Sequence, residues 1–581
     1  MPANSSNAWR PGTPAVPSRS GGPRLPTRKR ERRWGSWRAS SRSPGERKCE
    51  TRRTAGRRSN CSAERRRRRH GRSRRWRRRS RGGGRRRNGT ARGGRPAGTG
   101  LRRDGDGNHT GATTSHSSRR DARRSQQPNG EAARESRGHD GKEGRPPVGV
   151  TRRQFIGSVA LAGAAGGAAW ADIPGGYAAE AQRLTDLVQQ TFWDPVARQY
   201  RAPVRSAESV DSDPVHDNGY VLWPSVEALH ALAEGAAAMP RRYAPVIREV
   251  VGGLEQYFDP EKHAYNAWLR FPGNNDKYYD DNALMAISLA EAHRHTGVRG
   301  YRDRATEVME GFLKGGWDAS GSPGGMRWGT DPGNPATADR AACSTSMTAL
   351  AALRLAKLGV EERANLAFAQ ELLAWLLENL QDADGLIMDA LEPPDWRVRR
   401  VKWTYNTGVA LRAHVELYRL TGDAAPLEEA IRLAAAAVRR EGALYDGLVQ
   451  NPEHRYWYDS GFFVPYLVDG LMGLHETTGE PALRGEAERH ADYAYDLLRD
   501  RTDGLYWRNW RLWRIGEEQL AVWEALTGQT HRLEPDDSER SKAAEFTNMP
   551  LEQRPLVKTL LANAGTARMF WMMGRRAAVE G

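Results

Sequence analysis

Apolar residues recur at intervals of three and four along most of the chain after residue 172. Leu427, Ala430, Ile431, Ala434 and Val438 are one example. This spacing places the apolar side chains on one face of a helix. The pattern predicts helices over residues 177–193, 224–238, 243–258, 282–296, 301–315, 345–358, 361–380, 407–420, 426–440, 461–476, 482–499 and 515–527. Alternation typical of strands is confined to short pieces between them, so the sequence predicts an all-α fold.

The breaks between the predicted helices repeat along the chain. The tripeptide Asp-Gly-Leu occurs at 384–386, 446–448 and 503–505, and successive copies lie 62 and 57 residues apart. Counterparts occur earlier at similar intervals, at Gly325, Tyr265 and Tyr200. Thr-Gly pairs, typical of a helix C-terminus, occur between these breaks and end at Gly297, Gly422 and Gly479.

These repeats indicate about six units, each with two helices, one long loop and one tight turn. An amphipathic hairpin cannot cover its own apolar face, so the hairpins must pack on one another. Closing six hairpins into a ring covers the inner helices and leaves no exposed end. The sequence therefore predicts an (α/α)6 toroid whose longer loops gather at one mouth. An open solenoid is the alternative, but it needs polar capping repeats, and none is evident.

Charge divides the chain into two parts. Residues 1–150 hold 43 of the 90 basic and 11 of the 71 acidic residues, so their net charge is +32 and that of residues 151–581 is −13. The first part is rich in Arg, Gly, Ser and Pro without apolar periodicity, which predicts disorder. Clustered arginine is typical of nucleic-acid binding. We favour the alternative that this part is upstream sequence read from an early start site, and we expect no nucleic acid to bind the folded domain.

A twin-arginine export signal is predicted directly after this segment. Arg152 and Arg153 precede an apolar run over 156–170, and Ala169-Trp170-Ala171 provides a cleavage site of small residues. The run is too short for a stable membrane span. We therefore expect a signal peptide at 151–171, a secreted domain at 172–581 and no membrane span in the mature protein. An export signal must lie near an N-terminus, which is our reason for favouring a later start.

Adjacent carboxylates at Asp280 and Asp281 are the main candidates for chemistry. They lie at the start of a predicted helix, where a carboxylate is stabilised by about 0.3–1 kcal/mol. One Asp would suffice for that, and two neighbouring carboxylates repel each other. Glycoside hydrolysis uses two such groups, an acid that protonates the leaving oxygen and a carboxylate that attacks or activates water. Repulsion and the helix N-terminus favour one protonated and one ionised group.

Three segments resemble glycoside hydrolase family 76, the endo-α-1,6-mannanases. Residues 278–281 (Tyr-Tyr-Asp-Asp) resemble its signature, 324–328 (Gly-Gly-Met-Arg-Trp) its Gly-Gly-x-x-Trp loop, and 404–408 (Thr-Tyr-Asn-Thr-Gly) its Thr-Tyr-Asn-x-Gly segment. The resemblance covers roughly residues 175–575. It implies an (α/α)6 barrel and a retaining mechanism with Asp280 as nucleophile and Asp281 as general acid/base.

Further residues are candidates for binding a sugar, because aromatic faces pack on sugar C–H groups and polar side chains bond hydroxyls. The predicted substrate-binding residues are Tyr278, Tyr279, Asn282, Trp328, Trp403, Tyr405, Asn406 and Asp459. Other aromatic residues near loops are more often packing residues: Trp223, Trp268, Trp457, Tyr458 and Trp507. Two departures from the family bear on the choice of glycan, namely Leu284 in place of a Trp and the segment 331–340.

The sequence thus predicts a secreted retaining hydrolase of α-1,6-linked mannan, such as fungal mannan or actinobacterial lipomannan. No metal or organic cofactor is expected, because the histidines lack ligand spacing and no nucleotide-binding glycine loop follows a strand. The single domain cysteine, Cys343, excludes an internal disulfide there. The alternatives are an α/α-toroid epimerase or lyase, which would use His or Tyr for proton transfer, and a non-catalytic glycan-binding or cell-wall protein.

Overall fold

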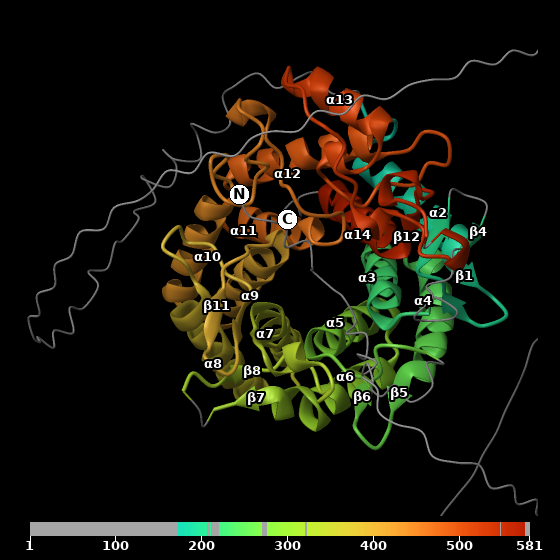
Figure 1. The fold of residues 1–581 in the computed structure, drawn as a ribbon. Coiled ribbons are helices and arrows are strands. Elements are labelled where there is room, and N and C mark those ends of the chain that lie inside the picture. Colours follow the sequence, from blue (N-terminus) through green and yellow to red (C-terminus); the bar gives the residue numbers. More distant parts are fainter. Residues whose placement is uncertain are drawn as a thin grey trace, which may run out of the picture. The chain divides into compact units, whose positions relative to one another are not determined.

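The computed structural model describes residues 172–205, 209–210, 220–269, 276–319, 322–546 and 548–575. The predictions of a disordered segment at 1–150 and of a signal peptide at 151–171 lie outside these residues. The described chain is a double ring of helices, as Figure 1 shows. It is an α/α toroid, as the amphipathic repeats predict.

The inner ring consists of six helices that pack side by side in chain order. They are α3 (Leu222–Ala238), α5 (Tyr279–Thr296), α7 (Ala342–Lys357), α9 (Thr404–Thr421), α11 (Val464–Thr478) and α14 (Leu560–Gly574). Helix α14 contacts both α11 and α3, which closes the ring.

Each inner helix is covered by an outer helix. The outer helices are α2 (Gly176–Phe192), α4 (Pro240–Leu254), α6 (Arg299–Gly311), α8 (Glu362–Leu380), α10 (Ala424–Ala437) and α12 (Pro481–Tyr493). The inner helices α5, α9 and α11 end at Gly297, Gly422 and Gly479, all with positive φ near 70°. The Thr-Gly markers are therefore confirmed as helix C-caps.

The ring closes in a way that the periodicity did not predict. Helix α14 lies outside the twelve predicted ranges, yet it is the sixth inner helix and packs on α2, the first outer one. The segment predicted at 515–527 does form α13 (Glu517–Thr527), but it is not a member of the ring. Nearly every residue of α14 is buried. A helix buried on all faces has no polar side, and so no amphipathic period reveals it.

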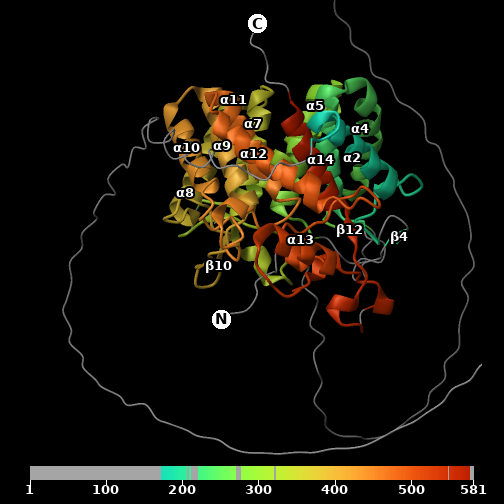
Figure 2. The same cartoon turned by 90° about the horizontal axis from the view of Figure 1, so that it is seen from above.

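Short strands form small sheets in the loops. The antiparallel pairs are β1 (Trp193–Asp194) with β2 (Gln199–Tyr200), β5 (Phe258–Asp259) with β6 (Ala264–Tyr265), and β7 (Trp317–Asp318) with β8 (Gly325–Met326). Two sheets have three strands, β3 (Pro203–Arg205), β4 (Ser209–Val210) and β12 (Lys558–Thr559), and β9 (Arg340–Ala341), β10 (Ala390–Glu392) and β11 (Arg397–Arg399). Figure 2 shows β4, β10, β12 and α13 at one end of the ring.

A repeated ion pair fixes the N-termini of inner helices at that end. Lys277, Lys402 and Lys558 each lie two residues before an inner helix and are buried. Their ammonium groups contact carboxylates of the preceding loop: Lys277 with Asp259 at 3.0 Å, Lys402 with Asp382 and Asp384 at 2.7 Å, and Lys558 with Asp500 and Asp503 at 2.7 and 3.0 Å. In these repeats, the Lys–Asp ion pair thus links the loop to the start of the next inner helix.

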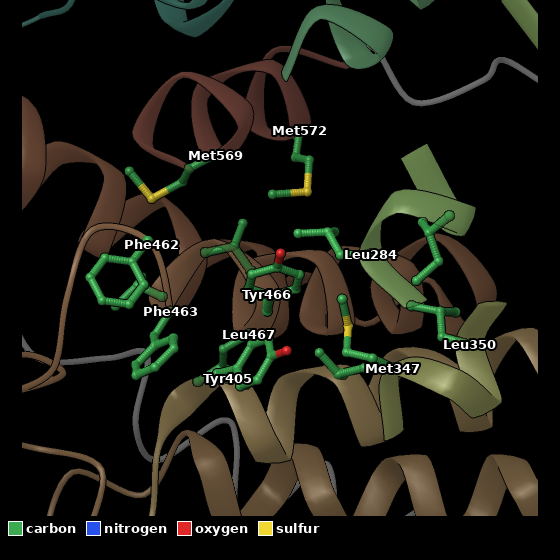
Figure 3. Close-up of a cluster of buried hydrophobic side chains, with 14 of the residues drawn as sticks. Leu284, Met347, Leu350, Tyr405, Phe462, Phe463, Tyr466, Leu467, Met569 and Met572 are labelled. Atoms are coloured by element: carbon green, nitrogen blue, oxygen red, sulfur yellow. The ribbon is translucent and has the colours of Figure 1, made fainter. Parts of the chain in front are cut away.

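Apolar side chains from several inner helices fill the centre of the ring. Figure 3 shows Leu284 of α5, Met347 of α7 and Met572 of α14 pointing toward one another. Leu284 is 1% exposed, so the structure places it in this core rather than on the surface of a cleft. Among the described residues, no helix is long and apolar enough to cross a membrane.

Candidate active site

A cleft of about 530 Å³ opens where the N-termini of the inner helices meet. Asp280 lies in the first turn of α5, Cys343 in that of α7, and Tyr405 and Asn406 in that of α9. The remaining lining residues come from the loops at this end and from the start of α3: Trp223, Trp328, Ala336, Asp339, Ala341, Asp389, Ala390, Arg399, Arg400, Val401, Trp403 and Phe463. The repeat that builds the ring therefore also delivers side chains of several units to one site.

Asp280 and Asp281 lie inside the first turn of α5. The helix is preceded by Tyr278 as N-cap residue, and no side chain caps it. An Asp near a helix start is typical of an N-cap residue, but neither carboxylate caps α5. Asp280 lines the cleft, whereas Asp281 lies deeper and is 7% exposed.

The two carboxylates differ in their surroundings. Burial raises the pKa of Asp280, but hydrogen bonds from the Cys343 thiol and from backbone N–H groups of the helix start oppose that rise. Burial also raises the pKa of Asp281 well above its usual range, and the neighbouring charge of Asp280 raises it further. Among the described residues, none forms an ion pair with either carboxylate. Asp281 is thus the member of the pair that retains a proton more readily, and Asp280 the one that ionises first.

Tyr405 and Asn406 from the start of α9 face the carboxylates. Tyr405 is stacked on Phe463 at 5.1 Å between ring centroids, and the charges of Asp280 and Asp281 contribute to the raised pKa of its hydroxyl. The Asn406 amide donates to Asp389 at 3.1 Å, while its buried oxygen has no hydrogen-bond partner. This oxygen is available to accept a bond from a ligand hydroxyl.

The cleft wall also holds a group of charged residues that the sequence did not predict. Arg399 donates to Asp339 at 2.5 Å and to Asp389 at 3.1 Å, and both carboxylates line the cleft. Burial raises the pKa of Asp339 to about 6 in spite of the guanidinium. Asp339 lies in the segment 331–340, whose unusual sequence was the only available signal. Sequence periodicity could not show that this loop and the β10–β11 hairpin meet.

Four predicted binding residues lie outside the cleft lining. Tyr279 stacks on Phe312 at 4.5 Å and is 7% exposed. The Asn282 amide is buried and is used entirely by backbone groups of Tyr265 and Tyr278. Tyr278 packs on Trp328 at 4.8 Å and so supports the cleft wall from behind.

Asp459 has a different position. Its carboxylate accepts from the backbone and hydroxyl of Thr404 at 2.7–2.9 Å, which ties its loop to the start of α9. It lines a second cavity beside the cleft. Of the other aromatic candidates, Trp223 lines the cleft and Tyr458 the second cavity, whereas Trp268, Trp457 and Trp507 are packing residues that are at least nine-tenths buried.

Two glycines of the family-like segments are explained by close contacts. A Cβ on Gly408 would lie 2.4 Å from the backbone nitrogen of Leu467, so glycine lets α9 and α11 approach each other. Gly325 has a φ of +103°, and its Cβ would meet the Trp375 ring. Within the described part of the chain, no group of three or more His, Cys, Asp or Glu is arranged to hold a metal ion.

Comparison with known proteins agrees with this architecture. The model of the family described as Glycosyl hydrolase family 76 matches residues 181–539. The Meiotically up-regulated gene 191 protein of Schizosaccharomyces pombe is 30% identical over 416 residues, which cover 68% of this chain and 91% of that protein.

Solved structures of low sequence identity share the fold. A family 76 α-mannanase of Bacteroides thetaiotaomicron is 19% identical with a TM-score of 0.52, over 68% of this chain and 94% of that chain. An inactive variant of an α-1,6-mannanase of a Salegentibacter species, in complex with α-1,6-mannotriose, is 18% identical with a TM-score of 0.50, over 68% of this chain and 98% of that chain.

Proposed function

The chain belongs to glycosyl hydrolase family 76 and is a glycoside hydrolase, and from this premise we propose that it cleaves α-1,6-linked mannan with retention of configuration. The observation that carries the proposal is the pair Asp280 and Asp281 at the mouth of the ring, where Asp280 lines the cleft, Asp281 is buried, and no described residue forms an ion pair with either carboxylate. Uncompensated buried charge is costly in a folded protein, and it is concentrated at functional sites.

The relatives support the substrate and the pair. Both solved relatives are described as mannanases, one of them with an α-1,6-mannotriose ligand. The variant in that complex is called inactive and carries asparagine in place of two consecutive aspartates. Asp280 and Asp281 are likewise consecutive aspartates, and Asp280 lines the cleft of this chain.

In the first step Asp280 acts as the nucleophile. Its carboxylate attacks the anomeric carbon of the mannose, and the bond from that carbon to the glycosidic oxygen breaks. Asp281 gives its proton to the departing oxygen. The raised pKa of Asp281 keeps this proton in place until the leaving group needs it, and the N–H groups of the α5 start favour the ionised form of Asp280.

In the second step Asp281 acts as a general base instead of a general acid. As a carboxylate it takes a proton from water, and the resulting hydroxide attacks the same anomeric carbon from the face that the leaving group left. The ester bond to Asp280 breaks and restores its carboxylate. Two displacements at one carbon retain the configuration.

The walls of the cleft are suited to a sugar chain. Trp223, Trp328 and Trp403 are only half-buried and line it, so their faces can pack on sugar C–H groups. The free oxygen of Asn406 and the carboxylates of Asp339 and Asp389 can accept bonds from hydroxyls.

The proposal is tested by incubating the protein with α-1,6-mannan and measuring released oligosaccharides. Wild type should release them, and Asp280→Asn and Asp281→Asn should not. Azide should restore turnover of an activated mannoside in Asp281→Asn, with an α-mannosyl azide as product, because azide needs no general base. Asp303→Asn is the matched control, since Asp303 is 61% exposed on α6. Absence of hydrolysis by wild type on every mannan tried would refute the proposed substrate.

We also propose that the chain is exported through the twin-arginine route, on the strength of Arg152, Arg153 and the apolar run that follows. The mature protein should then begin near Asp172. N-terminal sequencing of secreted protein checks this, and a terminus far upstream of residue 151 would contradict it.

A further inference from the structure

A second cavity of about 310 Å³ adjoins the cleft. Val401, Trp403 and Phe463 line both spaces, so a chain bound at Asp280 can continue past Trp403 into the second one. Both volumes are in the range of ligand sites, roughly 300–1,000 Å³. The second cavity differs in its charge, because Arg508, Arg511 and Arg514 all line it.

Two of these guanidinium groups lack an anionic partner. Arg508 lies over the Phe462 ring at 4.7 Å, and Arg511 lies between Tyr458 and Trp513 at 5.2 and 5.5 Å. Among the described residues, none makes an ion pair or a side-chain hydrogen bond with either guanidinium, and the buried Nε of Arg511 has no partner. Burial lowers the pKa of both groups, although arginine remains protonated at any ordinary pH.

The carboxylates that line the cavity are already engaged. Asp536 pairs with Arg514 at 3.3 Å and accepts from the Asn509 amide at 2.9 Å. Asp459 accepts from the backbone and hydroxyl of Thr404 and from the backbone of Ser460. Neither carboxylate forms an ion pair with Arg508 or Arg511, although Asp536 attracts both guanidinium groups at longer range.

Arginines that serve the fold are bonded differently in this molecule. Arg540 donates to the carbonyls of Leu551 and Ile515 at 3.1 and 2.6 Å. Arg455 donates to the carbonyls of Val449 and Arg440 at 2.6 and 3.3 Å. Arg508 and Arg511 have no such carbonyl partners, and their donors face a cavity instead. Packing alone does not account for two desolvated cations held on aromatic rings.

We propose that this cavity is a subsite for a phosphorylated sugar, with Arg508 and Arg511 binding the phosphate of a mannosyl residue. The inference rests on the proposed mannan hydrolysis for the identity of the sugar. Two forked donors from separate positions suit a tetrahedral anion with several oxygens. Two guanidinium groups that contact no carboxylate can together bind the several oxygens of a phosphate monoester, whereas a planar uronate carboxylate needs one guanidinium. The Trp403 ring lies between this subsite and Asp280, so phosphate binds the substrate away from the reacting bond.

The test is calorimetric binding of non-hydrolysable ligands to the whole protein. Mannose 6-phosphate should bind at least about tenfold more tightly than mannose, since hydrogen bonds between charged groups are the strong ones. Arg508→Gln and Arg511→Gln should each abolish most of this preference, and raised salt should weaken it. Arg532→Gln is the matched control, because Arg532 is 83% exposed and does not line the cavity. Arg508→Lys and Arg511→Lys, checked by thermal unfolding, replace any glutamine variant that does not fold.

Other results would overturn the proposal. Equal affinity for mannose and mannose 6-phosphate would do so, as would a preference that survives both arginine substitutions. If mannuronate binds as tightly as mannose 6-phosphate, the assignment of a phosphate ligand is wrong. If inorganic phosphate binds as tightly as mannose 6-phosphate, the cavity does not recognise the sugar. The binding assay is independent of turnover. Phosphate-dependent binding without any mannan cleavage would leave this inference standing and refute the proposed function, and the reverse result would refute only the inference.

Discussion

At the start of the inner helices, Asp280 and Asp281 form no ion pair with any described residue, whereas farther along the inner helices Glu416 and Asp469 are buried among guanidinium groups. Glu416 of α9 contacts Lys357 at 2.6 Å and Arg354 at 3.2 Å, both from α7. Asp469 of α11 contacts Arg568 of α14 at 3.0 Å. One set of helices thus buries carboxylates in two opposite electrostatic settings.

The pKa values follow these settings. Burial raises the pKa of Glu416, but Arg354, Arg412 and Lys357 together outweigh burial and lower it to about 2. The guanidinium groups around Asp469 likewise lower its pKa in spite of burial. Asp281 has no such partner, so burial and its neighbour act in the same direction and raise its pKa.

The ion-paired carboxylates stabilise the ring, whereas the carboxylates without a cation are the ones proposed to act on a substrate. The ion pairs of Arg354 and Arg568 join neighbouring inner helices, and a compensated charge has no tendency to exchange protons. The carboxylates at the mouth are left uncompensated, as proton transfer requires. Glu227 departs from this pattern, because burial raises its pKa although Arg568 lies 3.7 Å away.

The largest expected effect is on turnover at the mouth. Asp280→Asn should lower kcat on α-1,6-mannan by at least about 10³-fold, because it removes the nucleophile. It should not lower the thermal unfolding midpoint, since a neutral amide is easier to bury than an unpaired carboxylate. Kinetics and calorimetric unfolding of the same preparation check both. A variant that is inactive because it is unfolded would not support the comparison.

Breaking the buried ion pairs should have the opposite consequence. Arg354→Leu leaves Glu291 and Glu416 without their shared partner and should lower the free energy of unfolding by about 3–5 kcal/mol. Urea unfolding measures this. The double variant Arg354→Leu/Glu416→Gln should recover part of the loss. A loss below about 1 kcal/mol in the single variant would show that the network does not hold the ring.

The two ends should respond to pH with opposite sign. The pKa of Asp281 is higher in the folded than in the unfolded chain, so its destabilising effect is absent below about pH 4 and grows as pH rises. Asp281→Asn should therefore gain stability relative to wild type with rising pH. The pKa of Glu416 is about 2, so its contribution is complete above the unfolded pKa and is lost as pH falls toward 2.

Glu416→Gln should accordingly be most destabilising near neutral pH and least so in acid. Urea unfolding of both variants and wild type across this range checks the slopes, which cannot exceed about 1.4 kcal/mol per pH unit for one group. Slopes of the same sign would contradict the proposed electrostatic difference between the two ends.

The smallest expected effect separates binding from packing. Trp403→Ala should raise KM for mannan oligosaccharides about tenfold, because a stacked ring contributes on the order of 1 kcal/mol or more. Trp193→Ala is the control, since Trp193 packs on Tyr200 at 4.9 Å in the β1–β2 hairpin and should affect stability without changing KM. Equal KM effects would indicate that the Trp403 result reports folding.

Much of the ring was predictable from local signals. Outer helices such as α4 and α6 have one buried and one polar side, and glycines mark the ends of inner helices such as α5 and α9, so period and caps reveal them. Helix α14 could not be predicted in this way, because it is covered on all sides and its sequence has no polar stripe. Its place in the ring depends on contact with α2, about 385 residues earlier.

The candidate pair Asp280 and Asp281 could be proposed from the sequence because two like charges adjacent in sequence are also close in space. The charged residues of the cleft wall could not, because Asp339 and Arg399 are 60 residues apart and meet only through β10 and its neighbours β9 and β11. Asn282 shows that proximity in sequence to the pair does not place a side chain in the cleft. It lies in the same conspicuous segment as the pair, but its amide holds the β6 backbone rather than facing the cleft.

The central claim is tested most directly by trapping the covalent intermediate. The protein is treated with a fluorinated mannosyl fluoride that slows the second step, and the modified peptide is identified by mass spectrometry. We expect one mannosyl adduct per chain, attached to Asp280, and a lower yield of this adduct in the presence of a competing α-1,6-mannan oligosaccharide. An adduct on any other residue, or hydrolysis that gives the inverted anomer without an adduct, would contradict it.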